Sequence, residues 1–116
     1  TNSNESGDIM RGSFDIVKRN IKTGAISVLV KNGFVNIHPA LSPDMKRILY
    51  ISNEGGIFNI FLLDLVTLKT VKLTNYASGS SYPAWLPSGD GIAYVINVLQ
   101  GSEVRVEALN TRTSVK

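Results

Sequence analysis

The chain has 116 residues, of which 12 are basic and 9 acidic, so its formal net charge is +3 at pH 7. With 43% hydrophobic and 18% charged residues, the composition excludes a disordered chain, which needs low hydrophobicity and a high net charge. There is no cysteine, which excludes a disulfide scaffold, a thiol nucleophile and a thiolate metal site. No apolar run is long enough to cross a bilayer. No charged-then-apolar leader opens the chain, so we expect any signal peptide to be gone or never present.

A repeat of 44 residues runs through the chain without a gap. Pro39 and Pro83 are 44 residues apart, and so are Pro43 and Pro87. The same step brings further pairs into register, namely Phe14 on Phe58, Ile16 on Ile60, Ile48 on Ile92, Tyr50 on Tyr94, Leu65 on Leu109 and Lys72 on Lys116. Self-similarity at a fixed spacing is typical of repeat proteins in which each copy is one supersecondary unit.

Short runs rich in Ile, Val, Tyr and Phe, separated by turn residues, predict strands throughout the chain, and no helical periodicity or capping box is found. The first copy is expected to supply only a third and a fourth strand, at Phe14–Asn20 and Ala25–Val30. The second copy supplies four, at Asn36–Leu41, Arg47–Ser52, Phe58–Leu65 and Lys69–Thr74. The third copy supplies four, at Ser81–Trp85, Gly91–Asn97, Glu103–Leu109 and Thr113–Lys116.

The turn between the first two strands of each copy has a clear mechanism. In the sequence Ser-Pro-Asp-Met, Pro43 takes the second turn position, where its fixed φ suits a type I turn. Pro87 keeps that position in the next copy, and Gly89 adds a residue that tolerates positive φ. Four short antiparallel strands repeated every 40 to 45 residues are typical of propeller blades. We therefore predict an all-β fold made of four-stranded antiparallel β-propeller blades.

Blade boundaries follow from the repeat. Residues 1–12 form a poorly matched N-terminal segment, 13–30 a partial first blade, 31–74 a second blade and 75–116 a third, all in one propeller domain. A closed propeller has about four to eight blades, and 116 residues hold about 2.6 periods of this repeat. Either the chain is a piece of a longer propeller, which we favour, or copies assemble into a ring, as a dimer with six blades would. An open stack exposes apolar faces and edge strands, which favours association.

The repeat also resembles that of TolB-like β-propellers, whose blades run roughly as P-A-W-S-P-D-G-K-x-I-A-F-x-S, then I-Y-x-x-D-L, then a basic strand ending in L-T. The matching segments are His38–Ser52, Asp64-Leu65, Leu73-Thr74, Pro83-Ala84-Trp85 and Ile92-Ala93-Tyr94. The chain departs from the pattern at Met45, Leu86, Ser88 and Ala108. The resemblance implies a propeller that binds a protein or peptide in the bacterial periplasm or cell envelope; in that family the propeller contacts a peptidoglycan-associated lipoprotein. Propellers that gate prolyl oligopeptidase-type peptidases carry similar repeats, so a non-catalytic gating segment is the alternative.

No catalytic residue, metal site or cofactor is predicted. His38 is the only histidine, and Tyr82 takes its place in the next copy, which favours a shared structural role for the two rings. The chain has no Gly-x-Ser-x-Gly elbow and no phosphate-binding loop, and its carboxylates are scattered singly. We therefore expect a non-enzymatic protein. Basic residues are spread over different strands, so nucleic acid is not an expected partner.

Candidate binding residues lie on the loops that we expect at one face of the propeller. Loops between blades share that face with the loops joining second and third strands, and binding residues often gather on such loops. The segment Asn75–Ser81 is polar, flexible and carries an aromatic ring, although an ordinary connector would look the same. The predicted binding residues are Phe34, His38, Asn53, Glu54, Tyr76, Tyr82, Asn97 and Gln100. Their expected partner is a protein or peptide, with a further copy of the chain as a possible ring-completing partner.

Overall fold

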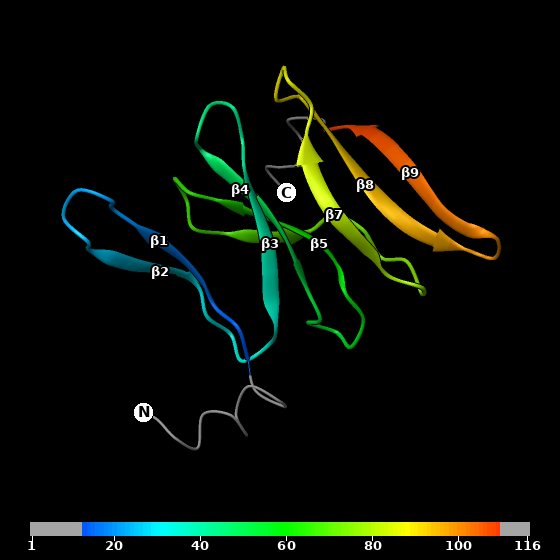
Figure 1. Ribbon diagram of the computed structural model, residues 1–116, viewed down its shortest axis with the longest axis horizontal. Coiled ribbons are helices and arrows are strands. Elements are labelled where there is room, and N and C mark those ends of the chain that lie inside the picture. The colour runs from blue at the N-terminus through cyan, green and yellow to red at the C-terminus, as the bar shows by residue number, and fades with distance from the viewer. Residues whose placement is uncertain (1–12, 110–116) are drawn as a thin grey trace. The chain divides into compact units, whose positions relative to one another are not determined.

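The structure is a computed structural model that describes residues 13–109. The described residues form nine β-strands and no helix, arranged in three antiparallel sheets (Figure 1). The prediction of an all-β fold is therefore confirmed. No helix among these residues could cross a membrane. The chain divides into two compact units, residues 1–37 and 38–116, which we describe one at a time.

The first unit holds a two-stranded sheet of β1 (Ile16–Arg19) and β2 (Ile26–Val30), which we call the first sheet. The side chain of Asn20 shapes the turn between the strands, because its Oδ1 accepts hydrogen bonds from the backbone amides of Lys22 (2.9 Å) and Thr23 (3.1 Å). Beyond β2 the chain returns to residue 14, where the amide of Asn36 donates to the carbonyl of Phe14 at 3.0 Å. The first strand begins two residues later than predicted.

The middle sheet contains β3 (Asn36–Leu41), β4 (Arg47–Ser52), β5 (Asn59–Asp64) and β6 (Thr70–Lys72), in that order. Its core consists of β4 and β5, whose apolar residues are buried on both faces of the sheet: Ile48, Leu49, Tyr50, Ile51, Ile60, Phe61, Leu62 and Leu63. The fourth strand is shorter than predicted, because the hydroxyl of Thr74 rather than a backbone carbonyl accepts the hydrogen bond from the amide of Ile60, at 2.9 Å.

The last sheet contains β7 (Ser80–Trp85), β8 (Gly91–Val98) and β9 (Gly101–Ala108). Strands β8 and β9 form a long hairpin whose register runs unbroken to the pair Val98 and Gly101. The middle sheet has a longer loop at the same place, residues 53–58. The strand predicted at Thr113–Lys116 lies outside the described residues.

The 44-residue repeat is visible in the backbone geometry of the turns. Met45 and Gly89, one period apart, have φ angles of 65° and 83°. Gly24 and Leu68, also one period apart, have φ angles of 79° and 63°. This left-handed region is uncommon for residues other than glycine. The copies therefore share one backbone path even where glycine is replaced by a larger residue.

Trp85 joins the last sheet to the middle sheet within the second unit. Its Nε1 donates a hydrogen bond of 2.8 Å to the carbonyl of Ala40 in β3, and the guanidinium of Arg47 lies 4.6 Å from the centre of the indole ring. Arg47 also donates through Nη2 to the carbonyl of Gly89 at 2.9 Å. One cation thus bridges the turn and the inner strand of the neighbouring sheet, a favourable cation–π geometry. These contacts fix how adjacent sheets of the repeat stack.

Candidate functional site

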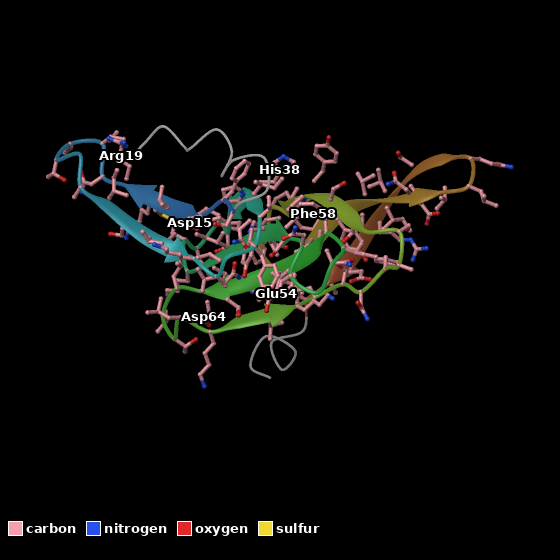
Figure 2. All side chains as sticks on the ribbon, turned by 90° about the horizontal axis from the view of Figure 1, so that it is seen from below. Asp15, Arg19, His38, Glu54, Phe58 and Asp64 are labelled. Atoms are coloured by element: carbon pink, nitrogen blue, oxygen red, sulfur yellow. The ribbon has the colours of Figure 1, made fainter. Side chains whose placement is uncertain are left out.

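Two aromatic rings lie together on the inner strands. His38 in β3 and Tyr82 in β7 are stacked, with ring centroids 5.5 Å apart and planes 17° from parallel. Tyr82 is 67% exposed, and Figure 2 shows the His38 ring at the rim of the sheets rather than among packed side chains. The structure thus brings together two of the predicted binding residues as a solvent-facing pair, which we call the ring pair.

Strained backbone holds the ring pair in place. His38 and Tyr82 have φ angles of 56° and 53°, and each is followed by a proline. The pairing of β7 with β8 is irregular between Ser81 and Ala84, and such bulges redirect side chains. A left-handed conformation costs a non-glycine residue roughly 1–2 kcal/mol, and strain of this kind often occurs at functional sites. The left-handed conformation occurs at the same position in two copies of the repeat, at His38 and at Tyr82, and both rings are exposed to solvent.

The structure has a pocket of about 390 Å³ formed by three segments of the second unit. It is lined by residues 56–58 of the loop between β4 and β5, by residues 78–81 and by Asn97 at the end of β8. Ser81, one of its lining residues, directly precedes Tyr82 in the sequence. None of the described residues that line the pocket is charged: its walls carry serine hydroxyls and a carboxamide, and Ile57 and Phe58 are its apolar residues. It can therefore supply hydrogen bonds and apolar contact to a neutral ligand.

A buried asparagine fixes one wall of this pocket. Asn59 is 1% exposed, and its Oδ1 accepts hydrogen bonds from the amide of Tyr76 (3.0 Å) and from the hydroxyls of Thr74 (3.0 Å) and Ser80 (3.1 Å). Its Nδ2 donates to the carbonyl of Tyr76 at 3.2 Å. The segment between β6 and β7 is thereby attached to the start of β5. Sequence reasoning missed this residue; the signal was a polar residue within an otherwise apolar strand.

Tyr76 is not among the residues that line the pocket, and its side chain contacts the last sheet instead. Its hydroxyl lies 2.9 Å from that of Tyr94 in β8, which in turn donates to a carboxylate oxygen of Glu107 at 2.8 Å. Burial, followed by the hydrogen bonds that Tyr94 makes with Tyr76 and Glu107, raises the pKa of Tyr94 well above its usual range. The guanidinium of Arg105 lies 5.9 Å from the Tyr76 ring. The half-buried Tyr76 thus connects the segment before β7 to the outer part of the last sheet.

The other predicted binding residues are spread more widely. Asn53 and Glu54 lie in the loop between β4 and β5, next to the residues that line the pocket. Gln100 is exposed at the tip of the β8–β9 hairpin. Phe34 belongs to the first unit, where its carbonyl accepts a hydrogen bond from the amide of Phe14 at 3.2 Å. Among residues 13–109 no group of three or more His, Asp or Glu side chains is placed to hold a metal ion.

Stability should fall as the pH rises through the alkaline range. Burial, together with the charge of Glu54, raises the pKa of Tyr50 to about 12, and Tyr94 is shifted in the same direction. An unfolded tyrosine ionises near pH 10, so above roughly pH 10 the unfolded chain releases protons that the folded chain keeps, and unfolding becomes easier. Urea midpoints at about pH 9, 10 and 11 should decline less steeply for Tyr50→Phe and for Tyr94→Phe. The exposed Tyr82→Phe is the control, and an unchanged decline in both buried variants would contradict the prediction.

Sequence comparison finds relatives that match part of the chain. No family model matches it. The Tol-Pal system protein TolB of Francisella tularensis subsp. mediasiatica is 29% identical over 75 residues, and that of subsp. holarctica is 29% identical over the same length. The matches cover 65% of this chain but only 17% of each relative. The matched segment thus spans about a sixth of the length of these proteins.

Solved structures with the same fold are also propellers. A putative TolB from Agrobacterium tumefaciens has a TM-score of 0.73 and 24% identity, covering 82% of this chain and 37% of that one. TolB from Acinetobacter baumannii has a TM-score of 0.70 and 24% identity, covering 84% and 28%. The β-propeller domain of the Trilobed protease from Pyrococcus furiosus has a TM-score of 0.61 and 20% identity, covering 81% and 30%. By its repeat and its fold the chain is built of β-propeller blades, and in sequence and structure it is similar to TolB proteins.

Proposed function

We propose that the chain is a non-enzymatic part of a TolB-type propeller that binds a protein or peptide partner in the bacterial cell envelope, with blades at residues 13–30, 31–74 and 75–116. The observation that carries this proposal is the ring pair, in which His38 and Tyr82 are held in solvent by strained backbone. The names of the curated relatives, which refer to the Tol-Pal system, support an envelope and periplasmic location and a protein partner.

The chemistry of the surface fits a protein segment. The exposed ring of Tyr82 offers a face on which an aromatic ring, a proline or a guanidinium of the partner stacks, and such rings often dominate binding energies. Ser81 and Asn97 present a hydroxyl and a carboxamide in the pocket of about 390 Å³, which suit the amide groups of a peptide main chain. The role of the chain is recognition, and no step of covalent chemistry belongs to it.

The test is the affinity of the chain for the peptidoglycan-associated lipoprotein of the same organism, measured by calorimetry. We expect Tyr82→Ala combined with His38→Ala to weaken binding at least about tenfold, the usual loss for a truncated anchor residue. Val66→Ala is the matched control, because Val66 is 73% exposed in the turn between β5 and β6. Affinity unchanged in the double variant, or no binding by the unaltered chain, would contradict the proposal.

A gating propeller segment of a prolyl oligopeptidase-type peptidase is the second candidate. The likeness to the propeller domain of the Trilobed protease favours it, since that domain belongs to a protease. The two functions differ in one measurable respect. A gating segment would not bind the lipoprotein through the ring pair, whereas the proposed partner-binding propeller does.

A further inference from the structure

The segment between β2 and β3 contains the one asparagine of the sequence that is followed by glycine, Asn32-Gly33 (Figure 1). Both residues are exposed. Gly33 has a φ of +84°, and a Cβ placed there would meet nothing within 4 Å. Among residues 13–109 the amide of Gly33 makes no hydrogen bond. Its nitrogen is therefore open to the neighbouring Asn32 side chain, without the crowding that a side chain at residue 33 would add.

The oxygen of the Asn32 carboxamide accepts two hydrogen bonds. The amide of Phe34 donates to Oδ1 at 3.1 Å, and Nδ2 of Asn36 donates to it at 2.9 Å. Asn36 is itself 1% exposed, and its Nδ2 also donates to the carbonyls of Phe14 and Phe34, each at 3.0 Å. This second donor is therefore fixed in place by its own contacts. Two donors on a carbonyl oxygen stabilise the negative charge that develops there when a nucleophile attacks the carbonyl carbon.

We propose that Asn32 is a site of spontaneous deamidation, in which the backbone of the chain supplies the nucleophile. The nitrogen of Gly33 attacks Cγ of Asn32 and forms a succinimide ring, and the bond between Cγ and Nδ2 breaks. The proton of the Gly33 amide leaves with Nδ2, which departs as ammonia. Water then opens the ring at either of its carbonyl carbons. Attack at Cγ gives aspartate, and attack at the backbone carbonyl gives isoaspartate, in which the chain continues through Cγ.

The reaction gives the surface a negative charge that the sequence does not encode. The formal net charge falls by one from +3, because a neutral carboxamide becomes a carboxylate. Aspartate keeps an oxygen for the amide of Phe34, whereas isoaspartate adds a methylene group to the backbone in the segment before β3. Phe34 is one of the predicted binding residues, so deamidation also alters a loop of the expected binding face. This consequence rests on the proposed function, whereas the reaction itself does not.

Asn20 provides the matched comparison within the same unit. Its Oδ1 also accepts two hydrogen bonds, from the amides of Lys22 and Thr23, but the next residue is Ile21. A β-branched side chain crowds the nitrogen that would have to attack, so we expect Asn20 to stay intact. Ile21 is 92% exposed, so glycine can replace it without loss of packing. Ile21→Gly should therefore turn Asn20 into a second deamidation site.

The first experiment incubates the unaltered chain at mildly alkaline pH and follows deamidation by peptide mapping, mass spectrometry and isoelectric focusing. We expect aspartate and isoaspartate at residue 32, and at no other asparagine of residues 13–109. Gly33→Ala should slow the reaction at least about tenfold, which requires only about 1.4 kcal/mol of added barrier. Gly24→Ala should leave the rate unchanged, because Gly24 is an exposed glycine of similar φ that does not follow an asparagine.

The second experiment compares the folded chain with the same chain in urea, where the donors to Oδ1 of Asn32 are lost. The folded chain should react at Asn32 at least as fast as the unfolded chain, and folded Ile21→Gly should also react at Asn20. The far-UV spectrum of each variant checks that its fold is kept. An Asn32 that stays intact in the folded chain, or that reacts more slowly there than in urea, would overturn the proposal. An unchanged rate in Gly33→Ala, or an intact Asn20 in Ile21→Gly, would overturn it equally.

Discussion

Replacing Asn59 with alanine should lower the free energy of unfolding by about 3–5 kcal/mol. The substitution removes the acceptor shared by the amide of Tyr76 and the hydroxyls of Thr74 and Ser80, and the donor to the carbonyl of Tyr76. A buried polar group left without its partner costs about 1–3 kcal/mol. Several such groups lose one partner at once, while the hydrogen bond between the hydroxyls of Thr74 and Ser80 offsets part of the loss.

Urea unfolding of Asn59→Ala and of the unaltered chain measures this effect. Asn97→Ala is the control, because Asn97 is exposed and surface substitutions usually change stability by less than about 0.5 kcal/mol. The segment released by Asn59→Ala includes residues that line the pocket, so affinity for the partner should fall with stability. A loss below about 1 kcal/mol would mean that the network around Asn59 does not hold the segment before β7.

Gly79→Ala should destabilise the chain by about 2–4 kcal/mol, as the sum of a conformational and a steric cost. Gly79 has a φ of +85°, and a Cβ there would lie 2.9 Å from the carbonyl oxygen of Phe58 and 3.4 Å from Cγ2 of Ile57. The carbonyl of Phe58 cannot move freely, because it accepts a hydrogen bond from the amide of Ser80 at 2.9 Å. The substitution must therefore separate two of the segments that line the pocket.

Gly24→Ala is the matched control for this prediction. Its φ is +79°, and a Cβ there meets nothing within 4 Å, so it should cost only the conformational part, roughly 1–2 kcal/mol. The difference between the two variants in denaturant unfolding isolates the close approach at Gly79. An equal loss of stability in the two variants would contradict the prediction. It would show that the loop between β4 and β5 can move to make room for the added methyl group.

Strand positions could be predicted well where the repeat and the turns agree. Strands β3 and β4 have the predicted bounds, because Pro43 and Asp44 mark the turn between them. The carboxylate of Asp44 accepts hydrogen bonds from the hydroxyl of Ser42 and from the amide of Lys46, which lower its pKa. The end of β6 could not be predicted, because Thr74 uses its side chain where a strand would use its backbone. A sequence pattern does not reveal that a side chain takes the place of a backbone acceptor, since threonine is itself common within strands.

The candidate site was predictable in its position but not in its contacts. The 44-residue spacing placed His38 and Tyr82 at equivalent points of neighbouring copies. Their stacking depends on a left-handed backbone at both residues, a conformation that is uncommon for residues other than glycine even though histidine adopts it more often than most, so tertiary packing decides it. Tyr76 was predicted on the same face as the ring pair, but its hydroxyl is paired with that of Tyr94. The sequence shows that this loop carries an aromatic ring. The orientation of the Tyr76 ring depends on Tyr94 in the last sheet, which the loop sequence does not reveal.

The left-handed turns have a consequence for how such repeats diverge. Glycine stands at this conformation in Gly24 and Gly89, while Leu68 and Met45 adopt it in other copies. The packed sheets, rather than the turn residue, therefore decide the path of the chain. Turn sequences can drift in evolution while the length of each copy stays at 44 residues. The 44-residue spacing therefore identifies a blade of this repeat more reliably than the residues at its turns do.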